Sequence, residues 1–295
     1  MEETTRPSLS HTSSSFDLLC ASVPLWQISN ELSTLTKTTQ VVFEERGALA
    51  FVLLNRPEKR NALTGGMLER LAEIFAGVAA RRDLRAVIVS GAGRDFCAGT
   101  DIRELESLDE TGARRKAVRG QEVCELVESC GTPVIAAVSG AAAGGGCELA
   151  LACHMRVAAT DARFSLPEAG LGLIPAYGGT QRLARAVGHG RALSAMLAGE
   201  EIRADEALRL GLVNRVVARD ELLAESESLA RAIVEASAPL AVRACLEAVT
   251  RGLRLPLEEG LALEAELFSR LFATADVREG TRAFLEKRKP VFEGK

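Results

Sequence analysis

Two short, uninterrupted apolar runs, residues 85–91 and residues 132–140, constrain the fold of this chain more than any other feature. A strand with one face in water alternates apolar and polar residues, whereas a strand covered on both faces can be apolar throughout. The segment between the two runs, around residues 117–129, is helix-like. The sequence therefore predicts buried strands that alternate with helices, which is typical of an α/β protein.

The region before these runs continues the same pattern. Residues 41–47 and 48–54 are rich in apolar residues and meet at Gly47, which predicts a β-hairpin. In residues 64–80 apolar side chains recur every three or four positions, and Thr64 is suited to cap a helix N-terminus. We expect an amphipathic helix there.

The last third of the chain changes character. Only residues 213–217 look extended, and the other segments suit helices: 204–210, 222–235, 240–251, 257–273 and 276–286. We therefore expect an α/β core over residues 41–200 and a mostly helical C-terminal region over residues 201–295.

Residues 1–40 form a third, different segment. They are rich in Ser and Thr, and one arginine and one lysine stand against four acidic residues. Organelle transit peptides are rich in arginine and poor in acids. We expect a poorly ordered extension of a cytoplasmic protein, dispensable for folding and activity; an organellar matrix stays open as the alternative.

Composition excludes several classes of protein. The 36 basic and 40 acidic residues give a net charge of −4, so no overall positive field recruits nucleic acid or an anionic membrane. No apolar run approaches the ~20 residues that span a bilayer. The three histidines are dispersed, and the seven cysteines form no Cys-x-x-Cys pair. We expect reduced, mostly buried thiols and no catalytic metal.

Two glycine-containing segments follow the buried runs. Gly144-Gly-Gly146 stands between a predicted strand and a helix-like run, and Ala98-Gly-Thr100 follows the other strand. Either segment alone could be an ordinary turn or a site of close packing. The alternative is functional, because a backbone without side chains at a helix start presents N–H donors to an anion or a developing oxyanion.

Two glutamates lie close to these segments in the sequence. Glu148 falls in the first turn of the predicted helix, where an acid is favourable in any protein. Ser165-Leu-Pro-Glu168 matches a Ser-x-x-Glu capping pattern, so a structural cap is the simpler interpretation of Glu168 alone.

Five ordered segments together resemble the enoyl-CoA hydratase/isomerase, or crotonase, family from Val41 to the C-terminus. They are Asn55-Arg-Pro-Glu-Lys-Arg-Asn-Ala-Leu63, Phe96-Cys-Ala-Gly-Thr-Asp-Ile102, Gly144-Gly-Gly-Cys-Glu-Leu149, Pro167-Glu168 with Gly178-Gly-Thr-Gln-Arg-Leu183, and Glu286-Lys-Arg-Lys-Pro-Val-Phe292. The resemblance implies a spiral of repeated ββα units followed by helices that assemble a homotrimer or homohexamer.

The resemblance also implies a reaction. The backbone N–H groups of Thr100 and Gly145 would form an oxyanion hole for a thioester carbonyl. Glu148 would deprotonate the attacking water, and Glu168 would protonate the α-carbon. The outcome would be syn hydration of a 2-enoyl-CoA to a 3-hydroxyacyl-CoA, with no cofactor, since coenzyme A is part of the substrate.

The same likeness suggests where coenzyme A binds. It places the nucleotide near Arg60, Ala62, Leu63 and the loop residues Asp101, Ile102 and Arg103, with Lys287 near the phosphates from the same or a neighbouring subunit. By spacing alone, the basic residues in this set are solvated surface charges.

At three positions the sequence differs from the motifs common in the family. Thr100 replaces a usual alanine, His154 stands where an aspartate is common, and Ala176 replaces a glycine after Pro175. The Ala176 methyl group can reshape the acyl pocket, whereas His154 is expected to be structural.

Two alternative functions follow from the family. Isomerases, decarboxylases and thioester hydrolases of the family often lack one of the two acids, so the presence of both favours a hydratase. The alternative is an enoyl-CoA isomerase, ranked second, or another acyl-CoA reaction of the family. A non-catalytic or RNA-binding relative is a different class, and the acidic pI of about 5.7 argues against RNA as the main ligand.

Overall fold

Two β-sheets organise the computed structural model, which describes residues 39–295. The larger sheet has the strand order β1-β2-β3-β4-β6-β9, and the smaller one has the order β5-β7-β8. In the larger sheet β1 (Val41–Arg46) pairs antiparallel with β2 (Leu49–Leu54) as the predicted hairpin, and all other pairs are parallel. The predicted extension, residues 1–40, lies almost wholly outside the described residues.

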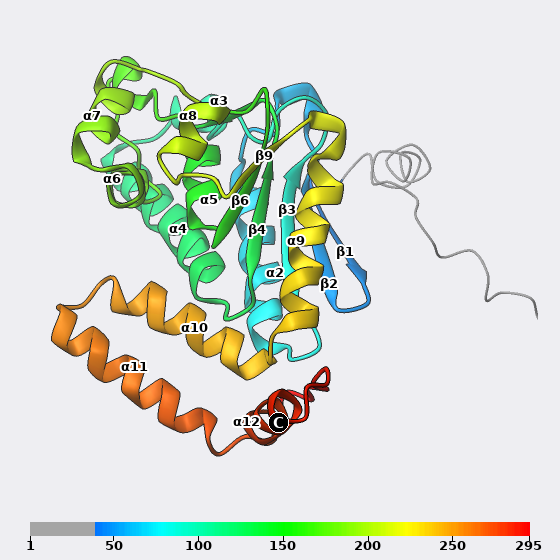
Figure 1. The fold of residues 1–295 in the computed structure, drawn as a ribbon. Helices are drawn as coiled ribbons and strands as arrows, with labels where there is room; N and C mark the ends of the chain where they lie inside the picture. Colours follow the sequence, from blue (N-terminus) through cyan, green and yellow to red (C-terminus); the bar gives the residue numbers. More distant parts are fainter. Residues whose placement is uncertain (1–38) are drawn as a thin grey trace, which may run out of the picture. The chain divides into compact units, whose positions relative to one another are not determined.

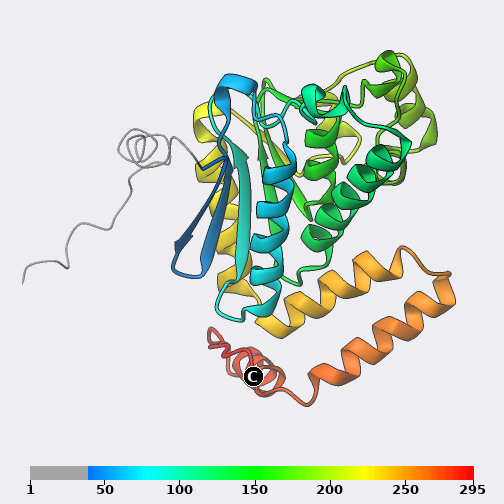
Figure 2. The same cartoon turned by 180° about the vertical axis from the view of Figure 1, so that it is seen from behind.

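The parallel strands are those that the apolar runs predict. The strands β3 (Ala86–Gly91) and β4 (Val134–Val138) are almost fully buried because both faces of the sheet are covered. Helix α9 (Leu222–Ala236) packs against β3, β4 and β6 (Met155–Ala159) on one face, whereas α2 (Gly65–Ala80) lies on the other (Figures 1 and 2). The Thr64 side chain caps α2 as predicted, accepting a bond from the Met67 N–H.

Strand pairs and helices alternate along the chain to form the expected spiral. β4 of the large sheet is followed by β5 (Ala141–Ala143) of the small sheet and then by α5 (Gly145–Ala152). The next turn repeats the order with β6 and β7 (Arg163–Ser165), and β7 pairs with both β5 and β8 (Ile202–Arg203). This is the repeated ββα arrangement predicted for residues 41–200.

The remaining elements surround this spiral or follow it. Between β3 and β4 lie α3 (Ile102–Leu105) and α4 (Glu110–Ser129), and after β7 come the 3-10 helix η3 (Glu168–Leu171), α6 (Gly179–Val187) and α7 (His189–Leu197). The C-terminal region contains α8 (Ala204–Arg209), β9 (Arg215–Val217), α10 (Pro239–Gly252), α11 (Leu257–Leu271) and α12 (Ala275–Leu285). The predicted helical C-terminal region is therefore confirmed, and α10, α11 and α12 extend as an arm beyond the sheet (Figure 1).

Two local predictions needed correction. α4 begins at Glu110, well before the predicted residue 117, because the Asp109 side chain accepts the Gly112 N–H and starts the helix there. The predicted Ser165 cap is wrong: Ser165 ends β7, and η3 has Pro167 at its N-cap position without a side-chain cap. Glu168 is therefore not held as part of a capping box.

Helix α4 approaches the site region closely because it has glycine at position 120. A Cβ atom on Gly120 would lie 1.9 Å from Cδ1 of Tyr177, so the aromatic ring occupies the space of a missing side chain. Gly77 in α2 offers a contrast, since a Cβ atom there meets nothing within 4 Å.

We predict opposite effects of alanine at these two helical glycines. Gly120→Ala should lower the free energy of unfolding by roughly 1–3 kcal/mol because it overpacks the Tyr177 ring. Gly77→Ala should raise the free energy of unfolding by up to about 1 kcal/mol, because alanine has a higher helix propensity than glycine at this exposed position. Urea denaturation of both variants is the measurement, and equal effects would contradict the packing of Gly120 on Tyr177.

Candidate active site

Glu148 is a buried carboxylic acid at the start of α5. Its side chain is 2% exposed, and its Oε1 atom accepts two backbone bonds of 2.7 Å, from the N–H groups of Tyr177 and Gly179. These donors belong to the turn that begins α6, where the helix dipole also favours negative charge. Both bonds fall on Oε1, so Oε2 keeps its capacity to hold another group.

Burial dominates the acidity of Glu148. Burial, and to a lesser extent the nearby Glu168 carboxyl, raise the pKa of this carboxyl to about 7, although the N–H bonds from Gly179 and Tyr177 act in the opposite direction. A carboxyl with a pKa near neutrality can both accept and return a proton at physiological pH.

Glu168 lies in the first turn of η3, close to the N-terminus of α5. A Cβ atom on Gly144 would lie 3.0 Å from Glu168 Oε1, so glycine at that position makes room for the acid. Burial raises the pKa of Glu168. Its Oε2 atom is buried without a hydrogen-bond partner in the described chain. An unsatisfied buried carboxyl oxygen favours the protonated acid or a site that a ligand completes.

Two segments run side by side next to these acids. Residues 97 and 142 form a parallel bridge, and the Ala143 N–H donates to Cys97 O at 2.9 Å. Gly99 and Gly144 have left-handed φ angles of 106° and 50°, and a Cβ atom on Gly99 would lie 2.9 Å from Ala143 O. Only glycine permits this close approach.

The close approach brings Thr100 next to Gly145. A Cβ atom on Gly145 would lie 3.1 Å from Thr100 Oγ1. The flanking residues of Thr100 are bonded to Leu63, through Leu63 N to Gly99 O and Asp101 N to Leu63 O, and this pairing does not use the Thr100 N–H. Gly145 is the first residue of α5, where an N–H has no partner within the helix. Two backbone donors are therefore available at one place.

Tyr177, the single tyrosine of the chain, connects the two halves of the site. Its N–H donates to Glu148, and its hydroxyl oxygen accepts a 3.1 Å bond from the Thr100 hydroxyl. The ring is buried, which raises the pKa of the phenol to about 12 and keeps it protonated. Sequence reasoning missed this residue, although a lone tyrosine inside a glycine-rich motif was a usable signal.

Asn61 and Asp95 are further residues that the motifs did not single out. The fully buried Asn61 amide donates to the carbonyl oxygens of Ala92, Asp95 and Phe96, and its own oxygen accepts the Arg56 N–H. The Asp95 carboxylate accepts the Ala141 N–H at 2.8 Å. These bonds fix the loop that leads from β3 to Thr100 and tie it to β5.

The residues expected to bind coenzyme A fall into two places. Arg60, Ala62, Leu63 and residues 101–103 lie together: Arg56 Nη1 donates to Ala62 O at 2.6 Å and pairs with Asp101, which caps α3. Arg60 pairs with Asp95 at 2.7 Å, yet most of its side chain is exposed. Lys287 follows α12, which lies far from α3 on the other side of the folded chain (Figures 1 and 2).

The remaining departures from the family wording have simple structural roles. His154 Nδ1 accepts the Val134 N–H at 2.9 Å, and its Nε2 atom donates to Glu128 O at 3.0 Å. Burial lowers the pKa of this ring, so it is neutral and structural, as expected. The Ala176 carbonyl accepts a bond from Gln121, and its methyl packs against the core.

Among residues 39–295, five of the six cysteines are buried and all are free, which confirms the prediction for that range. The same residues include no group of three or more metal-ligating side chains. No helix in this part of the chain is long and apolar enough to cross a membrane.

Comparisons with known proteins show the family of this chain. The family model described as enoyl-CoA hydratase/isomerase matches residues 44–295. A short-chain-enoyl-CoA hydratase of Clostridium acetobutylicum is 42% identical over 84% of this chain and 95% of its own length. A crotonyl-CoA hydratase of Syntrophomonas wolfei is also 42% identical, over 86% and 98%.

Solved structures show the same fold. The enoyl-CoA hydratase structure from Bacillus anthracis has a TM-score of 0.83 and 37% identity, covering 87% of this chain and 100% of that one. An enoyl-CoA hydratase structure from Geobacillus kaustophilus has a TM-score of 0.81 and 40% identity, covering 87% and 99%. The chain therefore belongs to the enoyl-CoA hydratase/isomerase family and has the crotonase fold.

Proposed function

We propose that the chain catalyses the syn addition of water to a 2-enoyl-CoA, giving a 3-hydroxyacyl-CoA. One observation supports this proposal most strongly: two buried carboxyl groups with raised pKa, Glu148 and Glu168, lie beside backbone N–H groups of Thr100 and Gly145 that are unbonded within the described residues. The relatives named short-chain-enoyl-CoA and crotonyl-CoA hydratase support this hydro-lyase activity and favour a short acyl chain.

The two backbone donors would bind the thioester oxygen. Attack at the β-carbon moves an electron pair through the α-carbon to that oxygen, which becomes an enolate. The N–H groups of Thr100 and Gly145, together with the positive end of the α5 dipole, stabilise this charge. In a site that excludes water, such preorganised donors lower the barrier to addition.

The two acids would move the protons. Glu148 Oε2 takes a proton from water while the water oxygen bonds to the β-carbon. The two N–H bonds to Oε1 hold the carboxylate in place. Glu168 gives its proton to the α-carbon and becomes a carboxylate. Water supplies both added groups after proton exchange with solvent, so the cycle uses no cofactor beyond the coenzyme A of the substrate.

The surrounding residues would bind the rest of the substrate. Arg60, Ala62, Leu63, Asp101, Ile102 and Arg103 lie on the chain segments that lead to Thr100, where the thioester would sit. Lys287 belongs to the C-terminal arm, so it would reach a nucleotide bound to a neighbouring subunit of an oligomer. A cytoplasmic location fits the bacterial relatives.

The first prediction concerns the two acids. Glu148→Gln and Glu168→Gln should each lower kcat for crotonyl-CoA hydration by roughly 10²–10⁴, because glutamine keeps the size but cannot exchange the proton. KM should change little, and the double variant should be scarcely slower than either single one. The decrease in absorbance of the conjugated thioester measures the rate.

A 3-enoyl-CoA substrate provides the control for this experiment. A single acid can move a proton between two carbons, whereas water addition needs both. Full hydration by Glu148→Gln would refute the mechanism, and loss of 3-enoyl isomerisation in Glu168→Gln alone would favour an isomerase. Tight RNA binding with a steep salt dependence and no hydration would indicate the non-catalytic alternative.

The second prediction concerns pH and stability without substrate. The pKa of Glu148 is about 7 in the folded protein and about 4.5 in the unfolded chain. Between these pH values the folded protein binds more protons than the unfolded chain. The free energy of unfolding therefore falls as the pH rises from about 4.5 to about 7. Glu148→Gln should therefore gain stability relative to the original protein across this window, by up to about 3 kcal/mol at pH 8.

Urea denaturation of both proteins at pH 5 and pH 8, at one subunit concentration, measures this difference. Glu69→Gln is the matched control, since that exposed carboxyl has a lowered rather than a raised pKa. A stability difference that does not grow between the two pH values would contradict a raised pKa for Glu148.

The third prediction is that the C-terminal arm forms a subunit interface. Leu263 and Leu267 on α11 are buried, but many other apolar side chains of the arm are exposed: Leu257, Leu261, Phe268, Phe272, Phe284 and Leu285. Exposed apolar groups of this extent mark an interaction surface. We propose a homotrimer or homohexamer.

Light scattering checks this proposal directly. The mass should be about three or six times the 31.4 kDa of one chain, and Phe268→Asp/Phe272→Asp should reduce it. Glu264→Gln, an exposed residue of the same helix, should leave the mass unchanged. A monomer at micromolar concentration would contradict an interface on this arm.

A further inference from the structure

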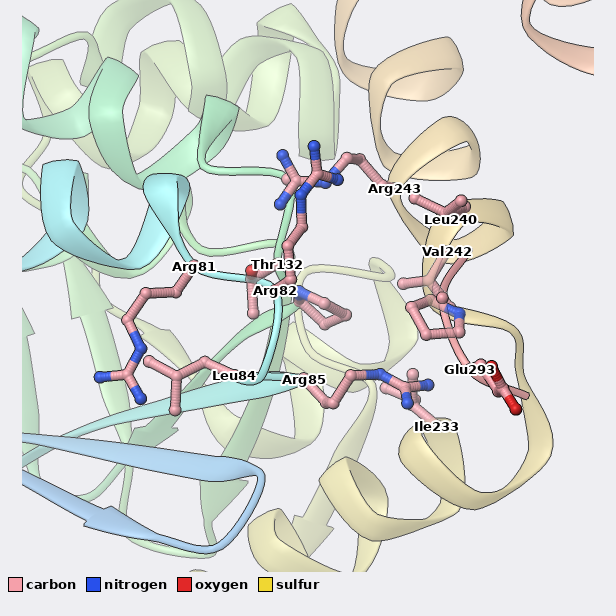
Figure 3. A pocket seen from close by; sticks show the side chains of 14 residues that line it. Arg81, Arg82, Leu84, Arg85, Thr132, Ile233, Leu240, Val242, Arg243 and Glu293 are labelled. Carbon is pink, nitrogen blue, oxygen red and sulfur yellow. The ribbon is translucent and has the colours of Figure 1, made fainter. Parts of the chain in front are cut away.

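A cavity lies at the end of the large sheet opposite the active site. Its lining includes Arg85 and Pro133, which immediately precede β3 and β4, together with Pro239 and Arg243 of α10 (Figure 3). The active-site segments follow the other ends of the same two strands. Strands of five or six residues separate the two places by about 17–20 Å.

Four arginines line this cavity, and two of them have bonded partners. Arg81 forms ion pairs with Glu45 and Asp83. Arg85 donates to the carbonyl oxygens of Val234 and Ser237 and so completes the C-terminal end of α9. These two guanidinium groups are explained by the fold.

Arg82 and Arg243 have no such partner. Within residues 39–295 neither makes an ion pair or a hydrogen bond to the protein. They are neighbours, because the Arg82 charge acts on Arg243 and lowers its pKa, after the larger effect of burial. Figure 3 shows their guanidinium groups close together beside the cavity. Glu247 on the same helix raises the Arg243 pKa, but its carboxylate is bonded to Arg251 and not to Arg243. With no bonded anion, the two adjacent cations repel each other, more strongly where one of them is partly buried.

The surrounding backbone holds Arg243 in this position. Gly131 has a left-handed φ of 70°, and a Cβ atom there would lie 2.9 Å from the Arg243 Cζ atom, so the guanidinium lies directly on the glycine. The one acid of the lining, Glu293, pairs with Lys295. The N-terminus of α10, at Pro239, adds a partial positive charge because Ala238 provides no side-chain cap.

We propose that Arg82 and Arg243 form an oxyanion-binding site, separate from the catalytic site, for phosphate or a phosphate monoester. Two guanidinium forks match the geometry of a tetrahedral oxyanion and bind it through charge-assisted hydrogen bonds. A bound dianion removes the repulsion between the two cations and complements the α10 dipole. The chemistry fits a phosphate group better than a carboxylate because two forks can share its oxygen atoms.

Thermal unfolding and calorimetry with inorganic phosphate test this site in the full-length protein. Phosphate should raise Tm and bind measurably, whereas sodium chloride at equal ionic strength should not. Arg82→Gln and Arg243→Gln should each weaken binding on the order of 10-fold or more, because each deletes charge-assisted bonds. Repeating the titration with a nucleoside monophosphate distinguishes a monoester from the free ion.

Arg81→Gln is the matched control, since Arg81 lines the same cavity but is already paired. It should keep full phosphate binding. In chloride alone, Arg82→Gln should raise Tm, because it removes a like charge next to Arg243. Hydration of crotonyl-CoA should be unchanged in Arg82→Gln and Arg243→Gln, which separates this site from the proposed reaction.

Two results would overturn the proposal. Phosphate binding that survives in the Arg82→Gln/Arg243→Gln double variant would belong to another site, such as the one for coenzyme A phosphates. Absence of phosphate binding, combined with a loss of oligomer mass in the double variant, would assign the two arginines to acidic side chains of a second copy.

Discussion

The burial of the Glu148 carboxyl group is the constraint on which the rest of the site depends. An ionised acid without compensation is strongly destabilising in an apolar interior, and here two backbone N–H groups at the start of α6 provide that compensation on one oxygen. A Cβ atom on Gly179 would lie 2.9 Å from Glu148 Oε1, so the Gly179 N–H can come this close only because the residue is a glycine. The turn at residues 177–179 thus holds the acid by one oxygen and leaves the second oxygen for the proposed proton transfer.

Close backbone approach is the second constraint, and it explains why glycines cluster in the motifs. Gly146 lets α5 lie against the segment at Cys97, since a Cβ atom on Gly146 would be 2.3 Å from Cys97 O. Gly99 and Gly144 allow the two donor-bearing segments to run side by side, and Gly120 admits the Tyr177 ring. This tight packing holds the Thr100 and Gly145 amides in place without a ligand, as the proposed oxyanion hole requires. Preorganised donors of this kind need no rearrangement as charge develops.

The sequence predicted those parts of the molecule that depend on local pattern. The buried strands β3 and β4, the capped helix α2 and the helical C-terminal region follow from apolar spacing, and the ordered motifs indicated the two acids and the two amides. Tyr177, Asn61 and Asp95 were missed because their roles arise from contacts across 29 or more residues, such as Asn61 with Asp95 O and Tyr177 with Glu148. The Ser165 prediction was wrong because a local pattern was outweighed by a distant contact. The sequence resembles a helix cap, but Ser165 pairs with β5 as part of strand β7.

The fold separates two kinds of charge along the same strands. On the side of the sheet where β3 and β4 end, Glu148 and Glu168 are buried and their pKa values rise, which suits the proton transfer proposed for them. At the amino ends, arginines gather, and Arg85 keeps its charge by donating to the last carbonyl groups of α9. A guanidinium cannot lose its proton in a protein, so the Arg82 and Arg243 pair has no route to neutrality equivalent to that of the two glutamates. An external anion or an acidic partner can relieve the repulsion between the arginines, whereas the glutamates relieve theirs by holding a proton.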